Sequence, residues 1–160
     1  MDVNALEQTA RRYGDSIYRI ALQYTGLPAD AEDVLQEVLL ERYRTDRVFA
    51  SEEHERRWLL RVAVNKSKNV IRGRRWWKTA PLDEAAKLYA PAGPSYRGLY
   101  DAVRSLPRSQ RMAVDLFYYE GYSTAEIAAI LNARETTVRT WLRRARLKLK
   151  ELLKEEWDDE

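Results

Sequence analysis

The chain has no cysteine and a single histidine, His54, which excludes disulfides, thiolate metal sites and histidine-rich metal sites. We expect no metal or other cofactor. No apolar run approaches the ~20 residues needed to cross a bilayer. The first five residues, Met1 to Ala5, lack the basic and apolar segments of a signal peptide. These absences predict a protein of the cytoplasm that does not insert into a membrane.

The net charge of +3 is small, but the charges are strongly segregated along the chain. Residues 30–41 contain five acidic and no basic side chains, whereas residues 56–78 contain nine basic and no acidic ones. A second basic block, residues 134–154, has eight basic against two acidic side chains. Two basic blocks favour two contacts with a polyanion, because each cation near a phosphate releases counterions. The acidic block favours a different, basic partner.

Apolar residues recur at the helical period, and no alternating stretch is long enough to predict a sheet. The sequence therefore predicts an all-α fold. We expect helices from Asp2 to Thr25, from about Pro28, and from Ser51 to near Gly73, the last running through Trp58. A second set comprises one helix with Leu99, Val103 and Leu106, one with Met112 to Phe117, one over 124–131, and a long one over 136–156.

Proline and glycine gather between residues 79 and 98, where the helical pattern breaks except for one short helix expected near Asp83 to Leu88. This segment predicts a linker at 79–98 between two small helical domains at 1–78 and 99–160. The two domains would then each carry one basic block.

Residues 123–146 have the anatomy of a helix-turn-helix. Ala128 is small where two helices must approach closely, and Asn132 tolerates the positive φ that the turn needs. Val138, Leu142 and Ala145 would face inward, and Glu126 would cap a helix start or orient arginines. The outward face, which we expect to read bases and hold phosphates, comprises Arg134, Thr136, Thr137, Arg139, Thr140, Arg143 and Arg146. The alternative is a plain helical hairpin with a solvated basic face.

The first basic block mixes cations with aromatic and amide side chains, a combination suited to single-stranded DNA. Asn65 and Asn69 are four residues apart and share a helical face, so both could meet one unpaired base. Trp58 fits the core better, whereas Trp76 and Trp77 fit either role. The DNA-binding set of this block comprises Arg61, Asn65, Lys66, Asn69 and Arg72.

Taken together, these stretches resemble the sigma factors of bacterial RNA polymerase in their smallest, extracytoplasmic-function form. Residues 30–37, Asp-Ala-Glu-Asp-Val-Leu-Gln-Glu, resemble the segment of region 2 that docks on the coiled coil of the polymerase β′ subunit. The resemblance implies that one face of this helix binds polymerase. Without the resemblance, the run of acidic residues would indicate an ordinary solvated face. That face comprises Asp33, Gln36, Glu37 and Leu40.

Residues 58–65, Trp-Leu-Leu-Arg-Val-Ala-Val-Asn, resemble the segment that captures a flipped base of the minus-ten promoter element, with Phe49 in the loop that completes the pocket. Leu106-Pro107 and residues 121–146 resemble region 4, which binds the minus-thirty-five element in the major groove and touches the β flap. The resemblance implies a factor that binds core polymerase and promoter DNA and helps melt it. It also adds anti-sigma proteins, which often restrain such factors, as a class of partner.

Two other classes of protein are open at this point. One is a stand-alone helix-turn-helix regulator whose N-terminal domain dimerises or senses an effector, although the Asn65 and Asn69 face argues against it. The other is a nuclease. The sequence argues against a nuclease, because it has no paired carboxylates beside a basic site and no metal cluster. We therefore expect a transcription initiation factor without enzymatic activity.

Overall fold

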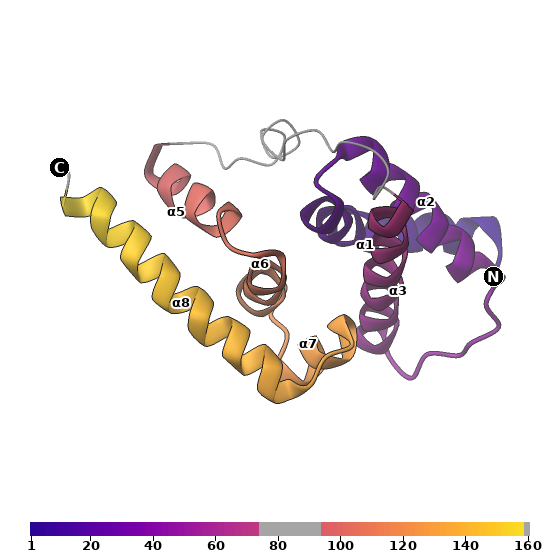
Figure 1. Cartoon of the computed structure of the whole chain (residues 1–160). Helices are drawn as coiled ribbons and strands as arrows, with labels where there is room; N and C mark the ends of the chain where they lie inside the picture. Colours follow the sequence, from indigo (N-terminus) through magenta and orange to yellow (C-terminus); the bar gives the residue numbers. More distant parts are fainter. Residues whose placement is uncertain (74–93, 159–160) are drawn as a thin grey trace. The chain divides into compact units, whose positions relative to one another are not determined.

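A computed structural model describes residues 1–73 and 94–158 of the chain (Figure 1). All regular elements in these two ranges are helices, which confirms the predicted all-α fold. The chain divides into two compact units, residues 1–85 and 86–160. The linker helix expected near Asp83 to Leu88, and also Trp76 and Trp77, lie outside the described residues.

The first unit contains three helices: α1 (Val3–Thr25), α2 (Pro28–Arg44) and α3 (Glu52–Gly73). Helix α1 begins where the Asp2 carboxylate accepts a hydrogen bond of 2.7 Å from the Ala5 N–H. It ends at Gly26, whose φ of 77° suits glycine because a Cβ atom would strain the left-handed conformation. Proline at the start of α2 and acidic residues in the first turn of α3 complete the predicted boundaries.

The three helices pack against one another around a single apolar core (Figure 1). Each helix contributes its inward stripe, and the largest side chains with almost no exposure are Ile17, Ile20, Val34, Val38, Leu59, Leu60 and Val64. Full burial of each such side chain stabilises the fold by about 1.5–3 kcal/mol before chain entropy is counted. The core therefore fixes which face of α2 and of α3 is left for solvent or partners.

The second unit contains α5 (Pro94–Arg104), α6 (Arg108–Val114), η2 (Asp115–Tyr119), α7 (Thr124–Leu131) and α8 (Glu135–Asp158). Two expectations need correction. Helix α5 begins at Pro94, inside the predicted linker, because proline is well suited to a helix start. The same helix ends at Arg104, so Leu106, expected within it, is buried in the turn that precedes α6 instead.

The helix expected over residues 112–117 is in fact α6 followed by the π-helical segment η2. The wider turn is closed where the Glu120 N–H donates to the Asp115 carbonyl at 3.0 Å. Three charged side chains, Arg111, Asp115 and Glu120, are buried around this segment. Burial, with a smaller contribution from Arg108 and Arg104, lowers the pKa of Arg111. A period of 3.6 residues does not predict such a widened turn.

Helix α8 runs the length of the second unit and packs against α5, α6 and α7 (Figure 1). Val138, Leu142 and Ala145 are its buried side chains, as the sequence predicted. The other elements of the unit contribute Met112, Leu116, Ile127 and Ile130 to the core, each with an exposed fraction of at most 1%. This packing determines which side of α8 faces outward.

The described residues offer neither a membrane span nor a metal site. None of the helices there is long and apolar enough to span a membrane. Within the same ranges, His, Asp and Glu side chains do not gather in threes as a metal ion would require.

Candidate polymerase and nucleic-acid interfaces

Helix α2 presents one exposed face opposite its buried residues Ala31, Val34 and Val38. All four residues predicted for polymerase binding lie on it, at the spacing of successive helical turns: Asp33, Gln36, Glu37 and Leu40. The side chain of Leu40 is 47% exposed, and Tyr43, one turn further, is 44% exposed. An acidic surface that ends in two exposed apolar side chains can bind a partner with cations around an apolar patch. Tyr43 was missed because an aromatic residue at this spacing also fits a core.

Helix α3 carries an exposed polar stripe on the side away from Leu59, Leu60, Ala63 and Val64. This stripe, which we call the α3 stripe, comprises Arg61, Asn65, Asn69 and Arg72. Steps of four, four and three residues keep these side chains on one face. Two cations flank two amides, so the α3 stripe can hold phosphates at its ends and bond base edges between them.

Lys66, which the sequence places in the same DNA-binding set, lies on a different flank of α3. Its Nζ atom is 3.4 Å from a carboxylate oxygen of Glu41 on α2, and both side chains are only partly exposed. The ion pair links the two helices. Sequence spacing groups Lys66 with the basic block, but the helical turn separates it from the α3 stripe by about a quarter of a circle.

An aromatic cluster stands at the end of the α3 stripe, where the loop between α2 and α3 folds back. The Phe49 ring lies 5.3 Å from the Trp58 ring, and the guanidinium carbon of Arg42 lies 4.8 Å from the Phe49 centroid. Trp58 is half-buried, which corrects the expectation that it belongs to the core. Spacing explains the difference, because Trp58 is three residues before Arg61 and shares the outward face. Phe49 is thus placed beside the α3 stripe.

Helices α7 and α8 form the predicted helix-turn-helix. Ser123 and Glu126 build a capping box, in which the Ser123 hydroxyl accepts from the Glu126 N–H and the Glu126 carboxylate accepts from the Ser123 N–H, both at 3.2 Å. Asn132 ends α7 with a φ of 53°, as its tolerance of positive φ predicted. The Thr124 hydroxyl donates to the Glu135 carboxylate at 2.8 Å and so ties the start of α7 to the start of α8. The capping box therefore fixes the start of α7, and Asn132 together with the Thr124–Glu135 hydrogen bond fixes the turn.

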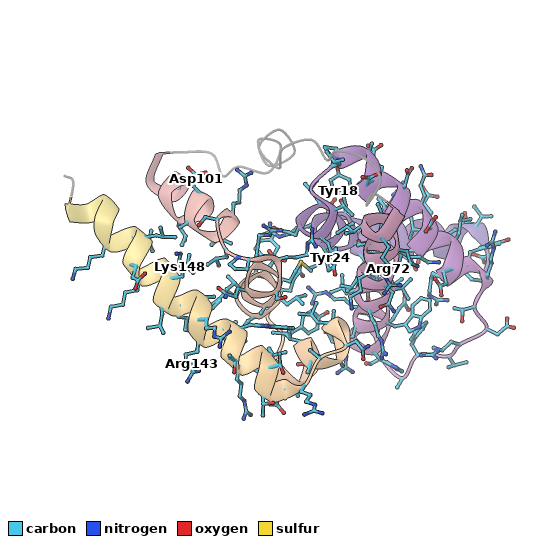
Figure 2. All side chains as sticks on the ribbon, in the orientation of Figure 1. Tyr18, Tyr24, Arg72, Asp101, Arg143 and Lys148 are labelled. Carbon is cyan, nitrogen blue, oxygen red and sulfur yellow. The ribbon has the colours of Figure 1, made fainter. Side chains whose placement is uncertain are left out.

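The residues predicted for duplex DNA lie on the part of α8 and its preceding turn that is not in the core. Thr137 and Thr140 are half-buried. The other five are exposed: Arg134, Thr136, Arg139, Arg143 and Arg146. Figure 2 shows Arg143 on the side of α8 away from α5 and α6. Arg139 is 2.8 Å from the Glu135 carboxylate, an exposed pair one turn apart that can exchange for a phosphate.

Arg146 differs from the other arginines because aromatic side chains of η2 hold it. Its Nε atom donates to the Tyr118 hydroxyl at 2.7 Å, and its guanidinium carbon lies 5.7 Å from the ring centroids of Phe117 and Tyr118. Tyr118 is 59% exposed, so this cluster is on the surface. The contact joins residues 28 positions apart and leaves no local signal, so sequence reasoning missed Tyr118.

Comparison with known proteins gives a consistent result for both units. Residues 9–77 match the family model for Sigma-70 region 2, and residues 96–149 match the model for Sigma-70, region 4. The chain is 31% identical over 157 residues to the ECF RNA polymerase sigma factor SigM of Mycobacterium tuberculosis, an alignment that covers 95% of this chain and 79% of that protein. It is 29% identical over 161 residues to the RNA polymerase sigma-E factor of Streptomyces coelicolor, covering 95% and 88% of the two chains.

Among solved structures, the sigma factor RpoE of Bartonella quintana, crystallised with the anti-sigma factor NepR, is similar in fold. The TM-score is 0.72 at 22% identity, with 95% of this chain and 98% of that chain covered. Two findings assign the family. The chain matches the family models of regions 2 and 4, and it is 31% identical to the mycobacterial factor. The chain therefore belongs to the sigma-70 family, as an ECF RNA polymerase sigma factor.

Proposed function

We propose that this sigma factor directs promoter-specific initiation through three surfaces of different chemistry. The α2 face binds core RNA polymerase, the α3 stripe with Phe49 binds the unpaired minus-ten element, and α8 binds the minus-thirty-five duplex. The observation that carries the proposal is that each surface lies on the side of its helix away from the apolar core, so all three are exposed to partners without unfolding. Such a factor works in the cytoplasm, where polymerase and chromosome are.

The assignment of the α2 face to the polymerase rests on its charge. Asp33 and Glu37 are repelled by the phosphates of DNA, so this face suits a protein partner with basic side chains. Leu40 supplies apolar area to be removed from water on binding. By its similarity to region 2, the partner element is the coiled coil of the β′ subunit.

The assignment of the α3 stripe to single-stranded DNA rests on its amides and the neighbouring ring. In a duplex the Watson–Crick edges of bases are occupied, whereas an unpaired base offers both its edges and its face. Asn65 and Asn69 supply amides, and Phe49 and Trp58 supply aromatic surface at one end. Arg61 and Arg72 would hold the flanking phosphates. Binding of the unpaired strand stabilises the melted promoter by mass action.

Helix α8 suits the major groove of a duplex. The groove admits one helix, and the outward arginines and threonines at the N-terminal end of α8 can reach base edges and phosphates. The β flap of the polymerase and anti-sigma proteins are further partners by similarity to region 4 and to the factor solved with NepR. Both would use surfaces that an initiation factor must expose.

Run-off transcription with purified core polymerase on a randomised promoter library tests this function. We expect transcripts only when the full chain is added, from templates that share two short elements separated by a fixed spacer. A test variant carries Asn65→Ala with Asn69→Ala. We expect it to bind core polymerase as the natural chain does but to give no promoter-specific transcript.

The rival functions would give different results. Strong binding of promoter duplex without polymerase, together with no transcript in the reconstituted assay, would indicate a stand-alone regulator. Transcripts that start at random positions would show that the factor binds polymerase without reading the promoter.

A further inference from the structure

The loop between α2 and α3, residues 45–51, has few anchors of its own. Val48 is 88% exposed, and Asp46 and Arg47 are exposed, whereas Phe49 is half-buried. Within the loop, the Arg47 N–H donates to the Thr45 hydroxyl at 3.3 Å, near the limit for a hydrogen bond. The position of Phe49 therefore depends on side chains from the flanking helices.

His54, in the first turn of α3, contacts this loop in three ways. Its Nδ1 atom accepts a hydrogen bond of 3.1 Å from the Ala50 N–H, directly after Phe49. Its own N–H donates to the Ser51 hydroxyl at 3.1 Å. Its ring meets the Phe49 ring edge to face, with centroids 5.4 Å apart and an interplanar angle of 80°. One side chain thus binds both the backbone and the aromatic ring of the loop.

Arg42, at the end of α2, closes the cluster from the other side. Its guanidinium lies over the Phe49 ring at 4.8 Å and 3.6 Å from the Glu55 carboxylate. The Arg42 and Glu55 side chains are only 13% and 18% exposed, so this ion pair is better shielded from water than the pairs Arg12–Glu52 and Lys66–Glu41. The Phe49 ring is therefore held between a fixed cation, the His54 ring and Trp58.

We propose that His54 is a positioning residue, which fixes Phe49 through the Ala50 N–H so that the 45–51 loop is preformed to receive the unpaired promoter base. The inference rests on the proposed function of the α3 stripe. A preformed loop binds the base without a further loss of chain entropy, whereas a loop without this bond must be ordered on binding. In this role the Nδ1 atom of His54 accepts the hydrogen bond from the Ala50 N–H.

Two substitutions separate the acceptor from the ring. His54→Asn keeps an acceptor at the position of Nδ1 and removes the ring, and His54→Phe keeps a ring and removes the acceptor. Each full-length variant is assembled with core polymerase on a promoter recovered from the run-off library. The fluorescent base 2-aminopurine stands in turn at each non-template position of the minus-ten element and brightens when its base unstacks.

We expect His54→Asn to unstack the base within about twofold of the natural chain and His54→Phe to lower the unstacking equilibrium about fivefold, as the loss of one hydrogen bond implies. Core affinity should be equal for all three chains. Equal unstacking by His54→Phe, or an equal loss in both variants, would overturn the inference. If His54→Phe does not fold, Arg42→Lys replaces it. Lysine keeps a charge for Glu55 but cannot stack on the Phe49 ring as a plane. Base unstacking by Arg42→Lys equal to that of the natural chain would overturn the role of the cluster.

Failure of the proposed function would look different. In that case the natural chain itself would give no rise in fluorescence at any position, whichever residue stands at position 54.

Discussion

At the scale of single residues, the contacts of Arg146 bear on its proposed role as a phosphate ligand. With Nε bonded to the Tyr118 hydroxyl and the guanidinium over two rings, the two terminal nitrogens are left to turn toward a ligand. Arginine loses much rotamer entropy when it is held in place, so an arginine already held binds with a smaller loss.

Tyr118→Phe is expected to weaken the binding of duplex minus-thirty-five DNA by the holoenzyme about two- to fivefold, because one hydrogen bond is lost and the stacking kept. The slope of log affinity against log salt should not change, since the number of cations is the same. Arg146→Ala should instead lower that slope by about 1. Fluorescence anisotropy over a salt series measures both quantities.

The matched control is Tyr119→Phe, because Tyr119 is the neighbouring tyrosine and is 65% exposed. It should leave both affinity and slope as they are. A loss at Tyr119 equal to that at Tyr118, or an unchanged slope in Arg146→Ala, would remove Arg146 from the phosphate-binding set.

Single residues were predictable where a local rule applies. Asn132 was assigned positive φ from its turn chemistry, and Val138 and Leu142 were assigned to the core from helical spacing. The contacts of Lys66 and Tyr118 were not predictable. Their partners, Glu41 and Arg146, are 25 and 28 positions away, and the pairs form only when the helices pack. A contact between distant elements has no signature at the positions themselves.

At the scale of elements, the turn between α7 and α8 fixes how α8, the proposed DNA-binding helix, is joined to α7. Asn132 is its central residue, the single non-glycine residue with positive φ among those that the structure describes. The Ala133 N–H donates to the Ala128 carbonyl at 2.9 Å, which closes the end of α7. The stability of this turn is therefore sensitive to the residue at position 132.

Asn132→Ala should destabilise the second unit by about 1 kcal/mol, because alanine adopts left-handed backbone at a cost of about 1–2 kcal/mol and asparagine at less. For a unit of this size the thermal midpoint would fall by about 4–8 °C. Asn132→Gly should change the free energy of unfolding by less than about 0.5 kcal/mol, because glycine relieves the backbone strain but loses more chain entropy on folding. Thermal unfolding followed by circular dichroism measures both, and an alanine variant as stable as the glycine variant would contradict the argument.

Elements were predictable where their ends carry capping signals. The bounds of α1, α3 and α7 agree with those expected from Asp2, Ser51 and Ser123 to within about a residue. The π-helical segment η2 was not predictable, because Asp115 and Glu120 at its two ends are buried, whereas helical periodicity assigns charged residues to the surface. Polar burial is decided by tertiary packing.

At the scale of the whole molecule, the segregation of charge along the sequence becomes a segregation by surface. The acidic block supplies the exposed face of α2, and the two basic blocks supply the α3 stripe and the outer side of α8. Composition and spacing predicted the two helical units and their charges, since these follow from each helix taken alone. The aromatic cluster at Phe49 depends on how three elements meet, so its contacts could not be derived from the pattern.

The central claim, that the α2 face binds core polymerase, is tested most directly by the affinity of the full chain for core enzyme after charge reversal. Asp33→Lys with Glu37→Lys places two cations on that face. Glu7→Lys with Asp15→Lys makes the same change of net charge at two exposed acids of α1, outside that face. We predict a loss of at least about 100-fold for the first pair, as several kcal/mol of like-charge repulsion implies, and less than about threefold for the second. Natural affinity in the first pair, or an equal loss in both, would contradict the account.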